Sequence, residues 1–161
     1  MDKELHRIAS TCIIYKDNSA SAQGFGEAKK YLLLQRSFEK KAFPGKWTVP
    51  GGGLSVDDYI NMPKTTSEHW YFALENSLRR EISEEAGIEV GELKYLCDMT
   101  FIRPDKIPVV ILSFYASYKN GEVVLDKDSI NHAWANYEEA REYDMVEGLI
   151  DEIKMVDEKI K

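Results

Sequence analysis

The chain has 161 residues and a formal net charge of −7 at pH 7, a length that suits a single domain, 1–161, with one core. Its composition is 43% hydrophobic and 30% charged, as in ordinary globular proteins. The negative charge argues against nucleic acid as a partner, and no apolar run reaches the roughly 20 residues that span a membrane.

The first half of the chain alternates short apolar runs with polar connections. Residues 10–15 (STCIIY) and 31–37 (YLLLQRS) are β-branched, aromatic and apolar, which predicts two strands. Residues 16–30 between them are small and polar, so we expect a loop there. A short strand is expected at residues 47–49, followed by a glycine turn and then by a polar stretch over residues 56–66.

A helix is predicted over residues 66–86. Thr65 and Glu68 have the spacing of a capping box at its start, and Gly87 stands where a helix-terminating glycine belongs. On a helical wheel an apolar face adjoins the acidic residues of this segment, so the acids lie beside the packed face. The apolar face comprises Tyr71, Leu78, Ile82 and Ala86.

The second half predicts a hairpin and a terminal helix. A pair of strands is predicted at residues 92–102 and 109–118, joined by a turn at residues 103–108. A short strand that leads into a short helix is predicted over residues 130–140. The tail from residue 144 carries a one-sided apolar stripe, which predicts a helix docked on the sheet. Mixed strands and helices make the class α/β or α+β. The stripe consists of Val146, Leu149, Ile150, Ile153, Val156 and Ile160.

The stretch LRREISEEAGI, residues 78–88, crowds three carboxylates onto one arc of the helix: Glu81, Glu84 and Glu85. Like charges at this spacing repel one another. Arg80 lies four residues before Glu84, so the two can pair. Carboxylates without histidine or cysteine suit Mg²⁺ or Mn²⁺, whereas a solvated acidic face is the alternative. Cys12 and Cys97 stand beside strand-like residues, which favours two reduced thiols and a cytoplasmic location.

The upstream stretch WTVPGGG, residues 47–53, places a glycine-rich turn directly after a strand. Glycine allows the backbone to approach a ligand closely, and a carbonyl of such a turn is a further oxygen ligand for a metal. Together with residues 80–88, this stretch resembles the Nudix hydrolase family, whose signature is G-x5-E-x7-R-E-U-x-E-E-x-G-U, with U a bulky aliphatic residue. The matches to its second half are Arg80, Glu81, Ile82, Glu84, Glu85, Gly87 and Ile88.

The resemblance implies an α/β fold, a Nudix-type α/β/α sandwich with a mixed β-sheet. It also implies hydrolysis of a pyrophosphate linkage in a nucleoside diphosphate derivative, with Mg²⁺ or Mn²⁺ as cofactor. Glu81, Glu84, Glu85 and the carbonyl of Gly51 are then the expected metal ligands, and Arg80 orients a carboxylate. Arg36 matches an arginine often found in the family's early strand and is expected to bind substrate.

Two further assignments are hypotheses about individual residues. Asp128 is a candidate general base or extra ligand, with a turn residue as the alternative. Trp70 could contact a base or ribose, with packing as the alternative. It lies in an insertion of about 14 residues within residues 54–72, which could cover the substrate or form a surface excursion. In that alignment the signature's first glutamate falls on Phe72, so this acid is missing or displaced.

The sequence leaves the substrate open between a nucleoside triphosphate and an ADP-ribose-like compound. Pro104 stands where some ADP-ribose-cleaving members carry a proline, but a hairpin turn also explains it. A nucleotide-binding module without catalysis is the main alternative. The family's prenyl diphosphate isomerase branch is disfavoured because both cysteines lie in strand-like runs. We expect a small nucleotide as partner and allow for a homodimer.

Overall fold

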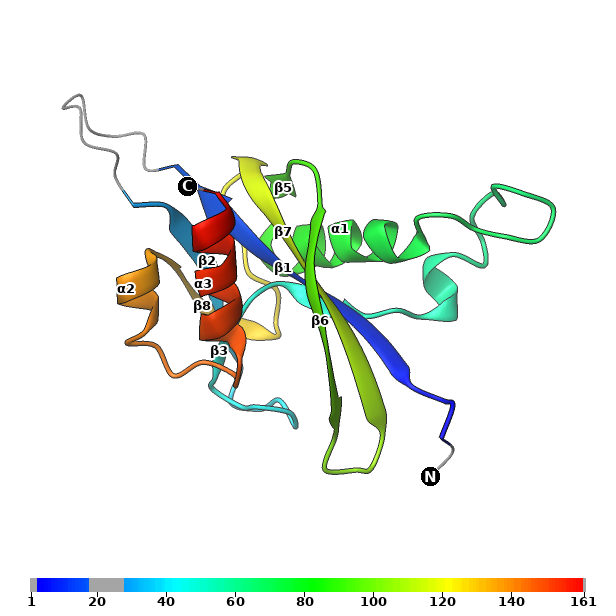
Figure 1. The fold of residues 1–161 in the computed structure, drawn as a ribbon, viewed down its shortest axis with the longest axis horizontal. Coiled ribbons are helices and arrows are strands. Elements are labelled where there is room, and N and C mark those ends of the chain that lie inside the picture. Colours follow the sequence, from blue (N-terminus) through cyan, green and yellow to red (C-terminus); the bar gives the residue numbers. More distant parts are fainter. Residues whose placement is uncertain (1–2, 18–27, 161) are drawn as a thin grey trace.

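The computed structural model describes residues 3–17 and 28–160, so residues 18–27 of the predicted loop lie outside the described part. Most strands belong to one mixed sheet, in which β1 and β7 run parallel over nine residue pairs and the other pairings are antiparallel (Figure 1). The strands are β1 (Arg7–Lys16), β2 (Lys30–Arg36), β3 (Trp47–Thr48), β4 (Gly51–Gly53), β5 (Glu89–Val90), β6 (Lys94–Ile102), β7 (Pro108–Asn120) and β8 (Ser129–Ala135).

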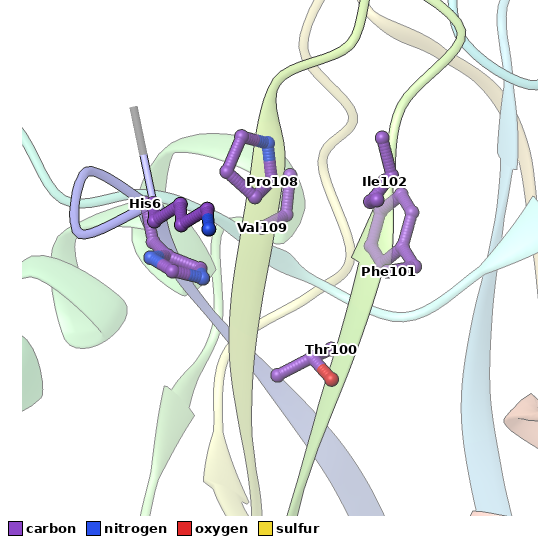
Figure 2. A pocket seen from close by; sticks show the side chains of 7 residues that line it. His6, Thr100, Phe101, Ile102, Pro108 and Val109 are labelled. Atoms are coloured by element: carbon purple, nitrogen blue, oxygen red, sulfur yellow. The ribbon is translucent and has the colours of Figure 1, made fainter. Parts of the chain in front are cut away.

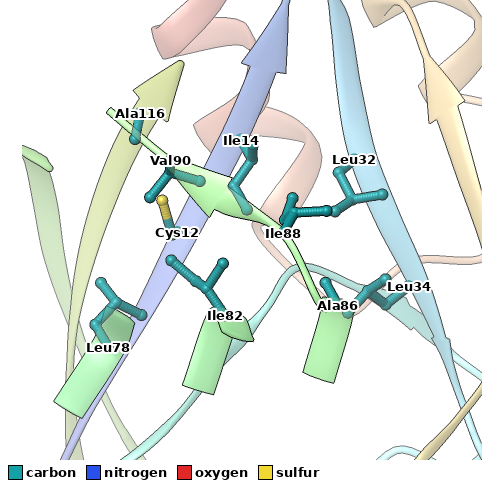
Figure 3. Close-up of a cluster of buried hydrophobic side chains, with 10 residues drawn as sticks. All are labelled: Cys12, Ile14, Leu32, Leu34, Leu78, Ile82, Ala86, Ile88, Val90 and Ala116. Atoms are coloured by element: carbon teal, nitrogen blue, oxygen red, sulfur yellow. The ribbon is translucent and has the colours of Figure 1, made fainter. Parts of the chain in front are cut away.

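The sheet lies between helices on its two faces, as predicted. Residues of β1 alternate between the faces: Cys12 and Ile14 pack with the buried side of α1 (Ala73–Ala86), as Figure 3 shows. Ile13 packs with α2 (Tyr137–Ala140) and α3 (Leu149–Lys159) on the other face. The α/β/α sandwich is therefore confirmed, and α1 and α3 lie on either side of the strands in Figure 1.

Strand β1 changes its neighbour part-way along, and this divides one edge of the sheet. Tyr15 and Lys16 pair with β2, whereas residues 9–11 pair with β4. The glycines of β4 permit this pairing, because a Cβ on Gly51 would come within 2.3 Å of the carbonyl oxygen of Ser10. The predicted glycine turn is therefore a short strand, held against β1.

Helix α1 begins later than predicted. It starts at Ala73 after Phe72, which has a φ of 61° and makes no side-chain cap. The predicted capping box is wrong, because the hydroxyl of Thr65 accepts a hydrogen bond from the Tyr71 amide instead. Tyr71 lies before the helix and is exposed, so it does not belong to the apolar face. The other three predicted members of that face are buried: Leu78, Ile82 and Ala86.

The inserted segment between β4 and α1 folds largely on itself. It contains a single 3₁₀ turn, Val56–Asp58, capped by Ser55. The Trp70 ring packs on Tyr59 with centroids 5.4 Å apart, and its Nε1 donates to the Met62 carbonyl. In Figure 1 the segment extends beyond the N-terminal end of α1, so it is a surface projection rather than a cover on the sheet.

The remaining predictions largely hold. Strands β6 and β7 form the predicted hairpin, and β8 leads into α2. The terminal helix begins at Leu149 rather than at residue 144 and buries its stripe through Leu149, Ile153 and Val156. Cys12 and Cys97 are free thiols. Among the described residues, no helix is both long and apolar enough to cross a membrane.

Candidate active site

The packing of α1 directs two of its acids toward β4. Because Leu78, Ile82 and Ala86 are buried against the sheet (Figure 3), residues 81 and 85 stand at the edge of that interface. The amide of Gly51 donates to Oε2 of Glu85 at 2.8 Å. A Cβ on Gly52 would lie 2.5 Å from the carboxyl carbon of Glu81. A side chain at position 52 would therefore force the Glu81 carboxylate to move from its present place.

Arg80 pairs with the acids around it. One terminal nitrogen, Nη1, lies 2.8 Å from Oε2 of Glu84, which confirms the pair predicted along the helix. The other, Nη2, lies 2.9 Å from Oε1 of Glu81 and 2.7 Å from Oδ1 of Asp58. The side chain of Asp58 is only 7% exposed, whereas that of Glu84 is 56% exposed. One guanidinium thus pairs with three carboxylates but neutralises only one negative charge, and the most buried of the three acids comes from the segment between β4 and α1.

Asp58 was missed by the sequence reasoning. Although burial opposes its ionisation, hydrogen bonds from Ser55 and Ser77 and the charge of Arg80 hold the pKa of Asp58 below its usual range. Counting the signature from Gly52 instead of backward from Arg80 puts its first acid on residue 58. The expected glutamate is therefore displaced and replaced by aspartate, and the extra residues follow it.

Glu85 is partly buried and lies near other carboxylates. Burial raises the pKa of its carboxyl from 4.5 to about 7, the amide of Gly51 opposes this rise, and the charges of Glu81 and Asp126 add to it. The nearby guanidinium of Arg36 lowers the pKa again. Burial is the main cause of this rise, and the smaller contribution from Glu81 and Asp126 is negative charge that would also favour a bound cation.

A cleft of about 670 Å³ opens where β1 parts from β2. Glu85 and the three glycines of β4 line one part of it, together with the basic residues Arg7, Arg36 and Lys40. Apolar side chains from β6, β7 and the residues around the start of α3 also line it. The apolar residues there are Met99, Phe101, Ile111, Val146 and Leu149. The cleft thus combines charged and apolar lining residues.

Of the three residues predicted to act on substrate, two line the cleft and one lies outside it. Arg36 lines the cleft, and its Nε donates to the carbonyl of Ala42 at 2.9 Å. Asp128 also lines the cleft and pairs with Nζ of Lys40 at 2.8 Å, and the hydrogen bond from Lys40 lowers the pKa of its carboxyl. Trp70 does not line the cleft, and neither does any other residue of the insertion beyond Gly53. Its ring packs within the insertion, and its contact with substrate stays a prediction.

A smaller pocket of about 370 Å³ lies near the β6–β7 turn and the residues before β1 (Figure 2). It is lined by Lys3 and His6 and by residues 100–102, 108 and 109. This pocket contains no carboxylate, so the oxygen-ligand chemistry predicted from the sequence belongs to the larger cleft.

The donor set at the larger cleft suits a hard divalent cation. All the candidate side-chain donors are carboxylate oxygens, and Glu81 and Glu85 are close enough to repel each other. Within residues 3–17 and 28–160 no three acidic, histidine or cysteine side chains already converge on one point. Glu81 and Glu84 instead face Arg80, so binding a cation would require these carboxylates to turn from the guanidinium.

Comparison with known protein families shows which family this chain belongs to. The NUDIX domain profile matches residues 6–154, which is nearly the whole chain. The chain belongs to the NUDIX family. The resemblance seen in residues 47–53 and 80–88 is thereby confirmed, and the protein is a Nudix hydrolase by family.

Individual relatives agree with the family and with the fold. The NUDIX chain is 28% identical over 126 residues to a nucleoside triphosphatase NudI from Escherichia coli, covering 71% of this chain and 79% of the relative. The NUDIX domain of Shewanella oneidensis NrtR, solved with ADP ribose, superposes with a TM-score of 0.72 at 16% identity, covering 98% of this chain and 90% of that one. A MutT protein from Methanosarcina mazei superposes at 0.69, with 20% identity and 99% of both chains covered.

Proposed function

We propose that this NUDIX protein hydrolyses the pyrophosphate linkage of a nucleoside diphosphate derivative, either a nucleoside triphosphate or an ADP-ribose-like compound, with Mg²⁺ or Mn²⁺. The observation that carries the proposal is that one cleft is lined by Glu85 and the glycines of β4, by three basic residues and by several apolar side chains. A nucleotide likewise combines charged phosphates with a flat base. The E. coli relative named as a nucleoside triphosphatase supports the same substrate class.

Glu81, Glu84, Glu85 and the carbonyl of Gly51 are the proposed metal ligands. When bound, the cation would neutralise phosphate charge and lower the pKa of a water molecule. The protein's part is to hold the carboxylates at one end of α1, against β4. Arg80 keeps two of them paired while no cation is present, which offsets their mutual repulsion.

The basic residues of the cleft are proposed to bind the phosphates. Arg36 and Lys40 approach from the β2 side, and the guanidinium of Arg7 lies over Gly53 at the end of β4. Asp128 remains the proposed proton acceptor. Its pairing with Lys40 makes it a weak base, and a substrate phosphate that draws Lys40 away would strengthen it.

A turnover screen of nucleoside triphosphates and ADP-ribose-like compounds, with product identification, tests this function. We expect release of phosphate-containing fragments with Mg²⁺ or Mn²⁺ and none in excess chelator. Glu84→Gln and Glu85→Gln should each lower kcat/KM by about 10²-fold or more. Glu75→Gln is the matched control, because Glu75 lies on the same helix but pairs with Arg79 at 3.2 Å.

Three outcomes would contradict the proposal. Full turnover in excess chelator would exclude the metal mechanism. Wild-type-like activity of both α1 variants would show that the acids are only surface charge. Tight nucleotide binding without any turnover would instead identify a nucleotide-binding module.

A further inference from the structure

Helix α3 carries an acid where its sequence calls for an apolar residue. Glu152 lies on the buried side of α3 with Leu149, Ile153 and Val156 and is only 5% exposed. Burying a carboxyl group is costly unless its oxygens are hydrogen-bonded. A leucine at this position would complete the apolar stripe, so the acid needs an explanation other than packing.

The hydrogen bonds of Glu152 are incomplete. The hydroxyl of Ser113, on β7, bonds to the carboxyl group, but its Oε2 is buried and has no partner among the described residues. Ser113 is itself buried and also contacts the hydroxyl of Thr11 at 3.2 Å. Glu152 has no ion pair with a basic residue of the described chain. One carboxylate oxygen is thus left without a donor.

Glu152 borders the cleft on the buried, apolar side of α3. Phe101 and Leu149 line the cleft with it, whereas Arg36 and Lys40 come from the end of β2 and the turn that follows it. A phosphate would be repelled by the carboxylate, and an apolar group would leave Oε2 unpaired. A flat ring that carries an N–H group suits both the apolar surroundings and the unpaired oxygen of Glu152. The faces of such a ring contact apolar side chains, while its edge donates a hydrogen bond.

We propose that Glu152 determines base specificity by accepting a hydrogen bond from an exocyclic amino group of the substrate's base. This inference rests on the proposed nucleotide substrate and narrows it to bases that carry such a group: guanine, adenine or cytosine. Removing the donor from the ligand leaves the carboxyl oxygen unpaired again. A buried acceptor without its donor costs more than the hydrogen bond itself contributes, so discrimination is strong.

The test is equilibrium binding of matched nucleoside 5′-monophosphates by calorimetry, which does not depend on turnover. The pairs differ only in the amino group: guanosine with inosine, adenosine with purine riboside, and cytidine with pyrimidin-2-one riboside. We expect the wild type to bind the amino-bearing member of at least one pair about 10-fold more tightly. Glu152→Leu should reduce this ratio to about one, whereas Glu152→Gln, which keeps a carbonyl acceptor, should retain most of it.

Two controls separate specificity from folding. Glu158→Leu changes an exposed acid on the same helix and should leave the ratio unchanged. Glu152→Leu should unfold at a temperature no lower than the wild type, because it removes an unpaired buried oxygen. Equal binding within all three pairs, or an unchanged ratio in Glu152→Leu, would overturn the proposal. Turnover without such discrimination would leave the hydrolase function standing and remove only this inference.

Discussion

Replacing Glu85 with glutamine should flatten the pH dependence of stability in the metal-free protein. The pKa of Glu85 is about 7 in the folded chain, against 4.5 for an unperturbed carboxyl. The folded state therefore binds this proton more tightly than the unfolded state does. The resulting stabilisation is complete below about pH 4.5 and is lost as the pH rises through about 7.

The size of the effect follows from the shift. Each pKa unit corresponds to about 1.4 kcal/mol, so Glu85 accounts for at most about 3 kcal/mol of the free energy of unfolding. Its carboxyl keeps partial contact with solvent, which lowers the figure. The buried Glu152 also has a raised pKa and changes stability in the same direction. A smaller slope should thus remain in Glu85→Gln.

Urea unfolding at pH 5 and pH 8 in the presence of a chelator measures this slope. The wild type should be less stable at pH 8, and added Mg²⁺ should restore stability there by binding the ionised site. Glu85→Gln should lose less stability between the two pH values and gain less from Mg²⁺, while Glu75→Gln should behave as the wild type. Equal slopes for Glu85→Gln and the wild type would refute the reasoning.

Three further variants test the contacts around the cleft. Gly53→Ala should raise KM for nucleotides, because a Cβ there would lie 2.3 Å from Nη2 of Arg7. The increase should vanish in an Arg7→Ala background, and an equal increase in both backgrounds would exclude this coupling. Asp58→Asn should lower the free energy of unfolding by about 1–2 kcal/mol through loss of its ion pair with Arg80, and urea titration showing no loss would contradict it. Trp70→Ala should lower the unfolding temperature but leave KM within about threefold of the wild type, and a larger rise in KM would support the predicted substrate contact.

The sequence by itself determined the features that depend on near neighbours. The i,i+4 spacing brings Arg80 and Glu84 together in any helix, and the structure shows that ion pair. Alternating and periodic apolar residues likewise identified the β6–β7 hairpin and the buried side of α1. These predictions succeeded because strand and helix geometry repeats over a few residues.

The start of α1 was predicted wrongly because the same local residues can form two different hydrogen-bond patterns. Thr65 and Glu68 have the spacing of a capping box, but the same hydroxyl groups can bond to nearby amides in turns. The hydroxyl oxygen of Thr66 accepts hydrogen bonds from the amides of Glu68 and His69 in this way. Local sequence offered two competing hydrogen-bond patterns, and packing of the insertion selected the turn.

Only the tertiary structure decided which of these residues share a site. The contact between Gly51 and Glu85 joins residues 34 positions apart, and Asp58 reaches Arg80 across 22 positions. The unpaired oxygen of Glu152 exists only because α3 packs against the sheet, where β1 and β6 are its neighbours. No local periodicity encodes such contacts, since they depend on where the chain returns after each turn. The helix pattern could therefore identify the acids, while the fold of the whole chain set their partners, their burial and the position of Glu85 in the cleft.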